Sequence, residues 1–125
     1  MKILAAIITH NRCELLERCI NHLQKQTRLP DSILVVNNGS TDATVDMLMR
    51  RNIQHITQEN LGSAGGWNRC ISYALEHHYD AVWLMDDDGF PNPSALERLE
   101  SNLETGTTCV SSVVLREKDR ERLVF

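Results

Sequence analysis

The chain has 125 residues, of which 42% are hydrophobic and 24% are charged, and it carries a formal net charge of −4. These values are typical of a single globular domain. The negative charge, with no basic stripe that follows phosphates, argues against nucleic acid as a partner. No run approaches the roughly 20 apolar residues that cross a bilayer.

The cysteines and the first apolar run indicate the cellular compartment in which the protein is expected. The four cysteines are Cys13, Cys19, Cys70 and Cys109. They form no Cys-x-x-Cys pair, and each falls in or at the start of an expected helix or strand, so we predict buried, reduced thiols rather than zinc ligands. The apolar run over residues 3–8 is too short for a signal peptide, and no small-residue cleavage site follows it. We therefore expect a cytoplasmic protein.

Residues 3–8 form a continuous, β-branched and apolar run, which predicts a strand covered on both faces. Apolar residues then recur at helical spacing, which predicts an amphipathic helix from about residue 12 to residue 26. Asn11, with Glu14 three residues later, is expected to cap the start of this helix.

A second buried strand is predicted over residues 33–36. The polar turn over residues 37–42 follows it, and Ser40 or Thr41 is expected to cap a short helix. The residues that this helix should bury are Val45, Leu48 and Met49.

A third, weaker strand is predicted over residues 53–57. The glycine-rich stretch 60–68 follows and runs into another helix. The expected inner face of that helix consists of Ala64, Trp67, Ile71, Ala74 and Leu75.

Residues 81–85 predict a buried strand that ends abruptly in three consecutive acids at 86–88. Asn92-Pro93 opens a further helix, because proline at a helix start gives up no hydrogen bond. The inner stripe of that helix is Leu96, Leu99 and Leu103. Residues 108–115 are rich in valine and predict a fifth strand.

Strands that alternate with helices predict an α/β fold with a mostly parallel sheet and helices on both faces. In such sheets, ligands bind beyond the carboxyl ends of the strands. The polar stretches 9–12, 37–42 and 86–88 follow strands one, two and four, and the glycine-rich stretch follows strand three. We therefore expect all four to meet at one edge of the sheet, and this edge is the candidate site.

The three acids predict a metal site. Neighbouring carboxylates repel one another, and a divalent cation among them removes much of that repulsion. Mg²⁺ and Mn²⁺ prefer oxygen ligands, so Asp86 and Asp88 are candidate metal ligands; the alternative is a solvated turn. Such a metal completes its shell with phosphate oxygens and neutralises a diphosphate leaving group. The residues thus predict a metal-dependent domain that binds a nucleoside diphosphate or a similar ligand.

The glycine-rich stretch narrows the class of ligand. It reads Gly-x-x-Gly-Gly over residues 62–66, which is neither the dinucleotide-binding Gly-x-Gly-x-x-Gly pattern nor a P-loop. A nicotinamide dehydrogenase and an ATPase are therefore disfavoured. Glycines here would let a ligand approach the backbone, and the helix start favours an anionic group; the alternative is a flexible turn beside a helix cap.

Four motifs together resemble a known family: Thr9-His10-Asn11-Arg12, residues 35–42 (VVNNGSTD), residues 60–66 (NLGSAGG) and Asp86-Asp87-Asp88. In order and spacing they resemble the family 2 glycosyltransferases, which have the GT-A (Rossmann-like) fold. The Gly-Gly stretch with the triple Asp is most similar to the rhamnosyltransferase and galactofuranosyltransferase branch. The resemblance covers residues 2–115.

The resemblance implies an inverting, metal-dependent transfer from a nucleotide-diphosphate sugar, UDP- or dTDP-linked, to a glycan or lipid-linked acceptor for cell-wall or surface polysaccharide. Asp86 and Asp88 would hold Mn²⁺ or Mg²⁺, and Asp87 would face the donor sugar. The implied nucleotide-binding residues are Thr9, Asn11, Arg12, Asn38, Gly65, Gly66, Asn68 and Asp86. A lipid-linked acceptor would extend the expected location to the inner face of a membrane.

Two departures from the family pattern matter. The pair that ends strand two, Asn37-Asn38, lacks the usual acid; an Asn amide offers a donor and an acceptor to a pyrimidine, so the base preference is open. The chain also ends before the acceptor region and the general base of the family, which are expected beyond Phe125. We therefore predict a truncated fold, with a donor-binding domain over residues 1–115 and the start of an acceptor-side region over residues 116–125.

Two other functions stay open at this point. One is a non-catalytic nucleotide-sugar-binding fragment. The other is a sugar-phosphate nucleotidyltransferase, which would want a glycine-rich, basic loop after strand one. The run of charges over residues 116–122 is interpreted as a solvated face. Apolar residues that an early stop would leave exposed are expected to drive self-association, and they include Leu123, Val124 and Phe125.

Overall fold

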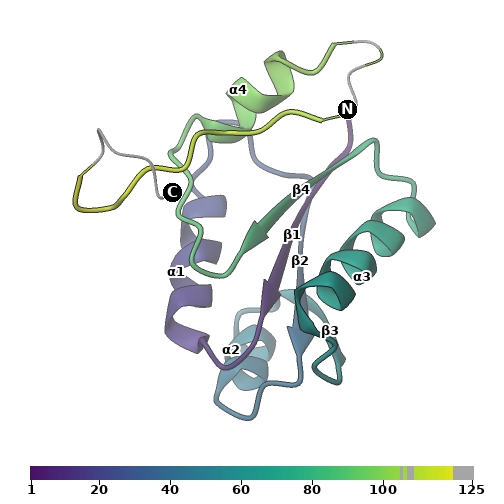
Figure 1. Cartoon of the computed structure of the whole chain (residues 1–125), viewed down its shortest axis with the longest axis vertical. Coiled ribbons are helices and arrows are strands. Elements are labelled where there is room, and N and C mark those ends of the chain that lie inside the picture. Colours follow the sequence, from purple (N-terminus) through teal and green to yellow (C-terminus); the bar gives the residue numbers. More distant parts are fainter. Residues whose placement is uncertain (105, 107–108, 120–125) are drawn as a thin grey trace.

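A computed structural model describes residues 1–104, 106 and 109–119 (Figure 1). Strands and helices alternate along the chain. The strands are β1 (Ile3–Thr9), β2 (Ser32–Asn38), β3 (Gln54–Gln58) and β4 (Ala81–Asp86), and the helices are α1 (Cys13–Leu23), α2 (Thr44–Arg50), α3 (Gly62–Glu76) and α4 (Ala95–Ser101). Each of the predicted strands and helices up to α4 is present, with bounds that differ by a few residues.

The four strands form one parallel sheet, as predicted, and their order in it is β3-β2-β1-β4. The apolar runs explain the two central positions, because all seven residues of β1 and the last five of β2 are buried. A strand in the middle of a parallel sheet is covered on both faces, which requires a continuous apolar sequence rather than an alternating one.

Helices cover both faces of the sheet (Figure 1). Ile7 and Val35 lie in one core with residues of α1 and α2, and Ile8 and Val36 lie in the other core with residues of α3. Successive strand residues point to opposite faces, so each central strand supplies both cores. Each large aliphatic side chain buried in this way contributes about 1.5–3 kcal/mol.

The inner face of α3 differs from the prediction. Its buried residues are Gly66, Cys70, Tyr73 and Ala74. Two of the expected core residues, Ile71 and Leu75, are instead 42% and 71% exposed. Ala64 is also exposed, and Trp67 is half-buried. Apolar residues lie on more than one side of this helix. The side that is buried is the one that carries Gly66, which lies close to Ile8 on β1.

The inner face of α2 is also corrected at one position. Met49, which was expected to be buried, is 68% exposed. The buried residues of this short helix are Thr44, Met47 and Leu48, and Val45 is half-buried.

The predicted fifth strand is wrong. In the part of the segment that the structure describes, residues 109–114 form no strand, and Leu115 makes an isolated bridge only; residue 108 lies outside the described residues. Val113 is 70% exposed. A strand needs a neighbour to satisfy its backbone and cover its apolar side chains, and valine content alone does not supply one.

The prediction that β4 is a buried strand is also wrong, because this strand lies at the edge of the sheet. It pairs with β1 on one side, and its residues are half-buried or exposed.

The cysteines are free thiols, but only two of the four are buried as predicted. Cys19 and Cys70 are buried, Cys13 is half-buried and Cys109 is exposed. Cys19 lies beneath the end of β4, with its sulfur 3.8 Å from the carbonyl oxygen of Asp86. Burial, together with the charges of the neighbouring acids, raises the pKa of Cys19 to about 12.

Neither expected helix cap, Asn11 for α1 nor Ser40 or Thr41 for α2, is present. Asp42 serves both helices instead. One carboxylate oxygen accepts a hydrogen bond from the amide of Cys13 at the start of α1 (3.2 Å), and the other accepts from the amide of Thr44 at the start of α2 (3.0 Å). The loop after β2 thereby satisfies backbone donors that the helix starts leave open.

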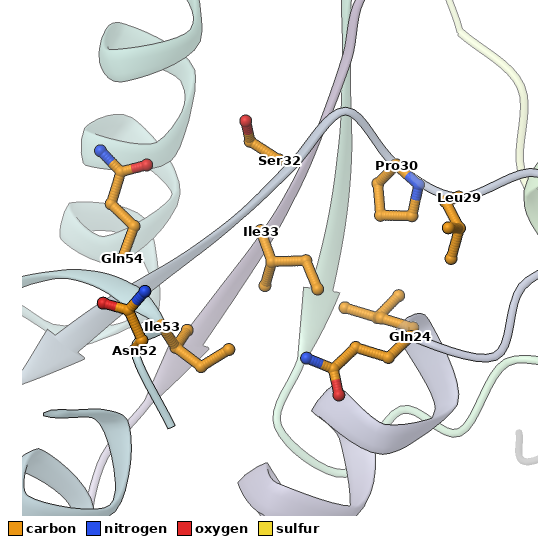
Figure 2. Close-up of a pocket in the computed structure, with 9 residues that line it drawn as sticks. Gln24, Leu29, Pro30, Ser32, Ile33, Asn52, Ile53 and Gln54 are labelled. Atoms are coloured by element: carbon orange, nitrogen blue, oxygen red, sulfur yellow. The ribbon is translucent and has the colours of Figure 1, made fainter. Parts of the chain in front are cut away.

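The amino end of the sheet lies opposite the edge where the predicted polar stretches meet. A shallow cavity of about 370 Å³ lies there, at the starts of β2 and β3 (Figure 2). Leu29, Ile33 and Ile53 give its lining an apolar character. Among the described residues, no helix has both the length and the apolar character needed to cross a bilayer.

Candidate functional site

The loops that follow the four strands meet at the carboxyl edge of the sheet, as the sequence predicts. His10, directly after β1, contacts the end of β2 through its Nδ1, which lies 2.7 Å from the carbonyl oxygen of Asn38. The side chain of Asn38 donates to the carbonyl of Gly62 at the start of α3 (3.1 Å). Arg12 reaches from the β1 loop to the acids after β4.

The three acids form a tight turn at the end of β4, in which the amide of Gly89 donates to the carbonyl of Asp86 (3.1 Å). Asp86 and Asp88 are exposed, whereas Asp87 is only 3% exposed. Two carboxylates of this acid turn (residues 86–89) are thus accessible to a ligand, and the middle one faces the protein.

Asp87 is held by two residues of the β1 loop. Its carboxylate accepts a hydrogen bond from Thr9 Oγ1 (2.9 Å) and pairs with the guanidinium of Arg12 (3.3 Å). The same guanidinium lies 3.7 Å from Asp88. Burial raises the pKa of Asp87, and the charges of its two acidic neighbours act in the same direction, against the bond from Thr9 and the charge of Arg12.

The exposed pair Asp86 and Asp88 fits a hard divalent cation by its chemistry, because carboxylate oxygens are ligands that Mg²⁺ and Mn²⁺ prefer. The guanidinium of Arg12 pairs with Asp87 and Asp88, and one positive charge against the three acids of the turn leaves an excess of negative charge there. In the described ranges, no group of three His, Cys, Asp or Glu side chains is placed to hold a metal by itself. The residues therefore suit a cation that takes its other ligands from water and phosphate.

Asn38, expected to contact the nucleotide, is buried, and both ends of its amide are engaged. Its Oδ1 accepts from Gln58 Nε2 on β3 (2.7 Å), and its Nδ2 donates to the carbonyl of Gly62 (3.1 Å). These bonds fix the end of β2 against β3 and α3. Contact with a base stays a prediction, and it would use the second hydrogen of Nδ2 or the second lone pair of Oδ1.

Gly66 serves the packing of α3. A Cβ at this position would lie 2.8 Å from Ile8 Cγ2 and 3.1 Å from Asn38 Nδ2, so only glycine lets the helix come this close to β1 and β2. Gly65 is half-buried and Asn68 is exposed in the same half of α3. Contact of these three residues with a nucleotide stays a prediction.

Sequence reasoning missed three residues that organise this edge: His10, Asp42 and Gln58. Asp42 could have been found, since an Asp side chain often accepts from a backbone amide two residues on, and this one accepts from Thr44. His10 lies between two residues that were predicted for the site. No local signal pairs Gln58 with Asn38, because the two lie on different strands.

The parallel sheet with an acid turn at its carboxyl edge defines the class of protein: an α/β domain of the GT-A type. The chain belongs to glycosyl transferase family 2, since the model of that family matches residues 5–124.

Two proteins that are similar in sequence to this chain are named as glycosyltransferases. The galactofuranosyltransferase GlfT1 of Mycolicibacterium smegmatis is 32% identical over 126 residues, which cover 97% of this chain and 42% of that protein. The galactofuranosyltransferase GlfT1 of Mycobacterium tuberculosis is 39% identical over 92 residues, which cover 70% of this chain and 30% of that protein. The chain thus spans less than half the length of both relatives.

A solved structure shows the same fold. The mannosyltransferase PcManGT from Pyrobaculum calidifontis, in complex with GDP-Man and Mn²⁺, superposes with a TM-score of 0.74 at 23% identity. The match covers 96% of this chain and 37% of that chain. The predicted α/β fold of GT-A type is confirmed.

Proposed function

We propose that residues 1–115 bind the nucleotide part of a sugar donor together with a divalent cation, as the donor-binding domain of an inverting glycosyltransferase. The observation that carries this proposal is the acid turn beside Thr9 and Arg12, at the edge where parallel α/β sheets bind ligands. Family membership supports sugar transfer as the reaction. A glycan or lipid-linked acceptor, and a role in cell-wall or surface polysaccharide synthesis, belong to the same proposal and are supported by the galactofuranosyltransferase relatives.

The proposed cation is Mn²⁺ or Mg²⁺, with Asp86 and Asp88 as its protein ligands. The Mn²⁺ in the structure of PcManGT supports this choice. A bound cation supplies Lewis-acid stabilisation of the negative charge that develops on a diphosphate leaving group. The proposed donor is UDP- or dTDP-linked.

The residues around the turn bind and orient the donor in this proposal. Arg12 and Thr9 hold the carboxylate of Asp87 at the inner side of the turn. The contact of Asp87 with the donor sugar that the resemblance implies would require this buried carboxylate to become accessible when the donor binds. General-base catalysis is typically worth about 10²–10⁴-fold, and no residue of 1–115 is proposed as that base. Glu117 is not offered as that base, because it is paired with Arg18 on α1.

A thermal-shift experiment tests donor and metal binding. UDP and Mn²⁺ added together should raise the Tm, because a ligand at about 100 times its Kd stabilises the folded state by about 2.7 kcal/mol. Asp88→Asn should abolish most of this shift and leave the Tm of the free protein unchanged, since Asp88 is exposed. The matched control is Asp46→Asn, an exposed acid in the first turn of α2 that belongs to none of the predicted site motifs. The absence of a shift with saturating UDP or dTDP would overturn the proposal.

Assays of turnover separate the alternatives. Sustained sugar transfer or donor hydrolysis by the isolated chain would exclude a purely binding fragment. Nucleotidyl transfer from a nucleoside triphosphate to a sugar phosphate would identify a nucleotidyltransferase instead. The loop Thr9-His10-Asn11-Arg12 carries no glycine, which disfavours this second activity.

A further inference from the structure

Asn11 joins the loop after β1 to the loop after β2. Its side-chain Oδ1 accepts hydrogen bonds from the amides of Thr41 (2.7 Å) and Asp42 (3.3 Å). In the opposite direction, the amide of Asn11 donates to Ser40 Oγ (3.0 Å). The two loops are thus tied by side-chain-to-backbone bonds that run both ways.

The backbone of Asn11 supports a special role for this residue. Its φ is +51°, in the left-handed region, which asparagine enters at lower cost than most other side chains. Backbone conformations of this kind persist where the surrounding structure holds them, and they gather at functional sites. Asn52, with a φ of +55°, shares the conformation but precedes β3, at the amino end of the sheet.

Asp42 completes the connection on the other side of the loop. Its carboxylate accepts from the amide of Cys13 at the start of α1 and from the amide and hydroxyl of Thr44 at the start of α2. Residues 40–42 are therefore bound to both ends of the β1 loop, at Asn11 and at Cys13. We call this set of bonds the Asn11–Asp42 bracket.

The carboxamide of Asn11 has little left for a nucleotide. Two amides occupy its Oδ1, whose two lone pairs are its acceptor capacity, and its Nδ2 lies 3.3 Å from His10 Nε2. Arg12 follows directly in the chain, and Asn38 ends the strand that leads into residues 40–42. The bracket therefore sets the spacing between two side chains that are predicted to bind the nucleotide.

We propose that Asn11 is a positioning residue: through the Asn11–Asp42 bracket it holds Arg12 and Asn38 at the separation that the donor nucleotide requires, without contacting the nucleotide. This inference rests on the proposed function and revises the expected role of Asn11 as a direct contact. A loop that is released from the bracket spends less time in the competent arrangement, and the apparent Kd rises in proportion.

The first variant separates the effect of the Asn11 side chain from the effect of its left-handed backbone conformation. Asn11→Gly keeps the left-handed backbone accessible and removes the side-chain bonds of Asn11 with Thr41 and Asp42. We expect it to weaken UDP binding in the presence of Mn²⁺ about tenfold. Asn52→Gly makes the same change at the amino end of the sheet and should leave binding unchanged. Titration calorimetry on the whole chain measures both, and far-UV circular dichroism checks that each variant is folded.

A second variant distinguishes positioning from direct contact. Asp42→Asn weakens the other side of the bracket, and positioning predicts that it also weakens UDP binding, with a double variant Asn11→Gly/Asp42→Asn less than additive. Amide hydrogen exchange at Thr41 and Asp42 in the ligand-free protein should be faster in Asn11→Gly than in the wild type. A direct contact of Asn11 with the nucleotide predicts additive losses of affinity instead.

The outcomes separate this inference from the proposed function. If the wild-type chain binds UDP and Asn11→Gly binds it equally well, the positioning role is overturned and the proposed function stands. Unchanged exchange at Thr41 and Asp42 also overturns the bracket, whatever the affinity. If the wild type binds neither UDP nor dTDP, the proposed function fails and the inference fails with it.

Discussion

Gly66 is the position where packing and helix propensity make opposite predictions. Alanine is favoured over glycine inside a helix by about 1 kcal/mol, so propensity alone predicts that Gly66→Ala stabilises the protein. The structure predicts the reverse, because the added Cβ would lie 2.8 Å from Ile8 Cγ2 and 3.1 Å from Asn38 Nδ2. Overpacking of this kind costs about 1–3 kcal/mol.

The net expectation for Gly66→Ala is a loss of about 1 kcal/mol, which lowers the Tm of a domain of this size by about 4 °C. Urea unfolding of the ligand-free protein measures the free energy directly. Asn68→Ala, at an exposed position of the same helix, is the control and should show the gain in propensity without the clash. A rise in stability for Gly66→Ala would refute the close-packing argument.

Three other predictions concern ionisable groups. Asp87→Asn should raise the Tm at pH 7 but not below about pH 4, because a pKa raised by burial makes the folded state lose stability as the pH rises through it; an equal Tm at pH 7 would contradict this. Arg28 contacts Glu100 at 2.8 and 3.2 Å and lowers its pKa. A lowered pKa means that the ionised Glu100 stabilises the folded state, and this contribution is lost as the pH falls through the folded pKa. Glu100→Gln should therefore lower the free energy of unfolding by about 1 kcal/mol at pH 7 and leave it unchanged near pH 2, as urea unfolding measures. A maleimide at about pH 7 should label exposed Cys109 and spare Cys19, whose pKa burial raises to about 12, as mass spectrometry of the native protein can show.

The sequence predicted the sheet well where a local pattern has a single structural solution. The apolar runs of β1 and β2 are continuous and short, and a buried parallel strand is what such runs form. The polar stretches after the strands then had to meet, because parallel strands share one carboxyl edge. The sequence alone therefore predicts that the acid turn and the β1 loop lie together.

The prediction failed where the outcome depends on distant residues. Apolar residues of α3 lie on two sides, and the face around Ile71 and Leu75 fits a helical period as well as the face that is buried. In the observed orientation of α3, Gly66 lies against Ile8 of β1, and this contact joins residues that are far apart in the sequence. The bond from Gln58 to Asn38 is also long-range, and it changes what the amide of Asn38 has available for a ligand.

The position of β4 gives the acid turn a second consequence, for behaviour in solution. An edge strand presents unpaired backbone groups that can template pairing with another chain, and natural proteins protect such edges with charge and short length. β4 has six residues, and in the described part of the chain it lies at the edge of the sheet, with three like charges at its end. Repulsion between two copies of that end disfavours their alignment, so we expect these acids to protect the edge strand against pairing with a second copy of the chain. Replacing all three acids at once should therefore increase self-association of the chain, whereas a single substitution leaves two of the charges in place.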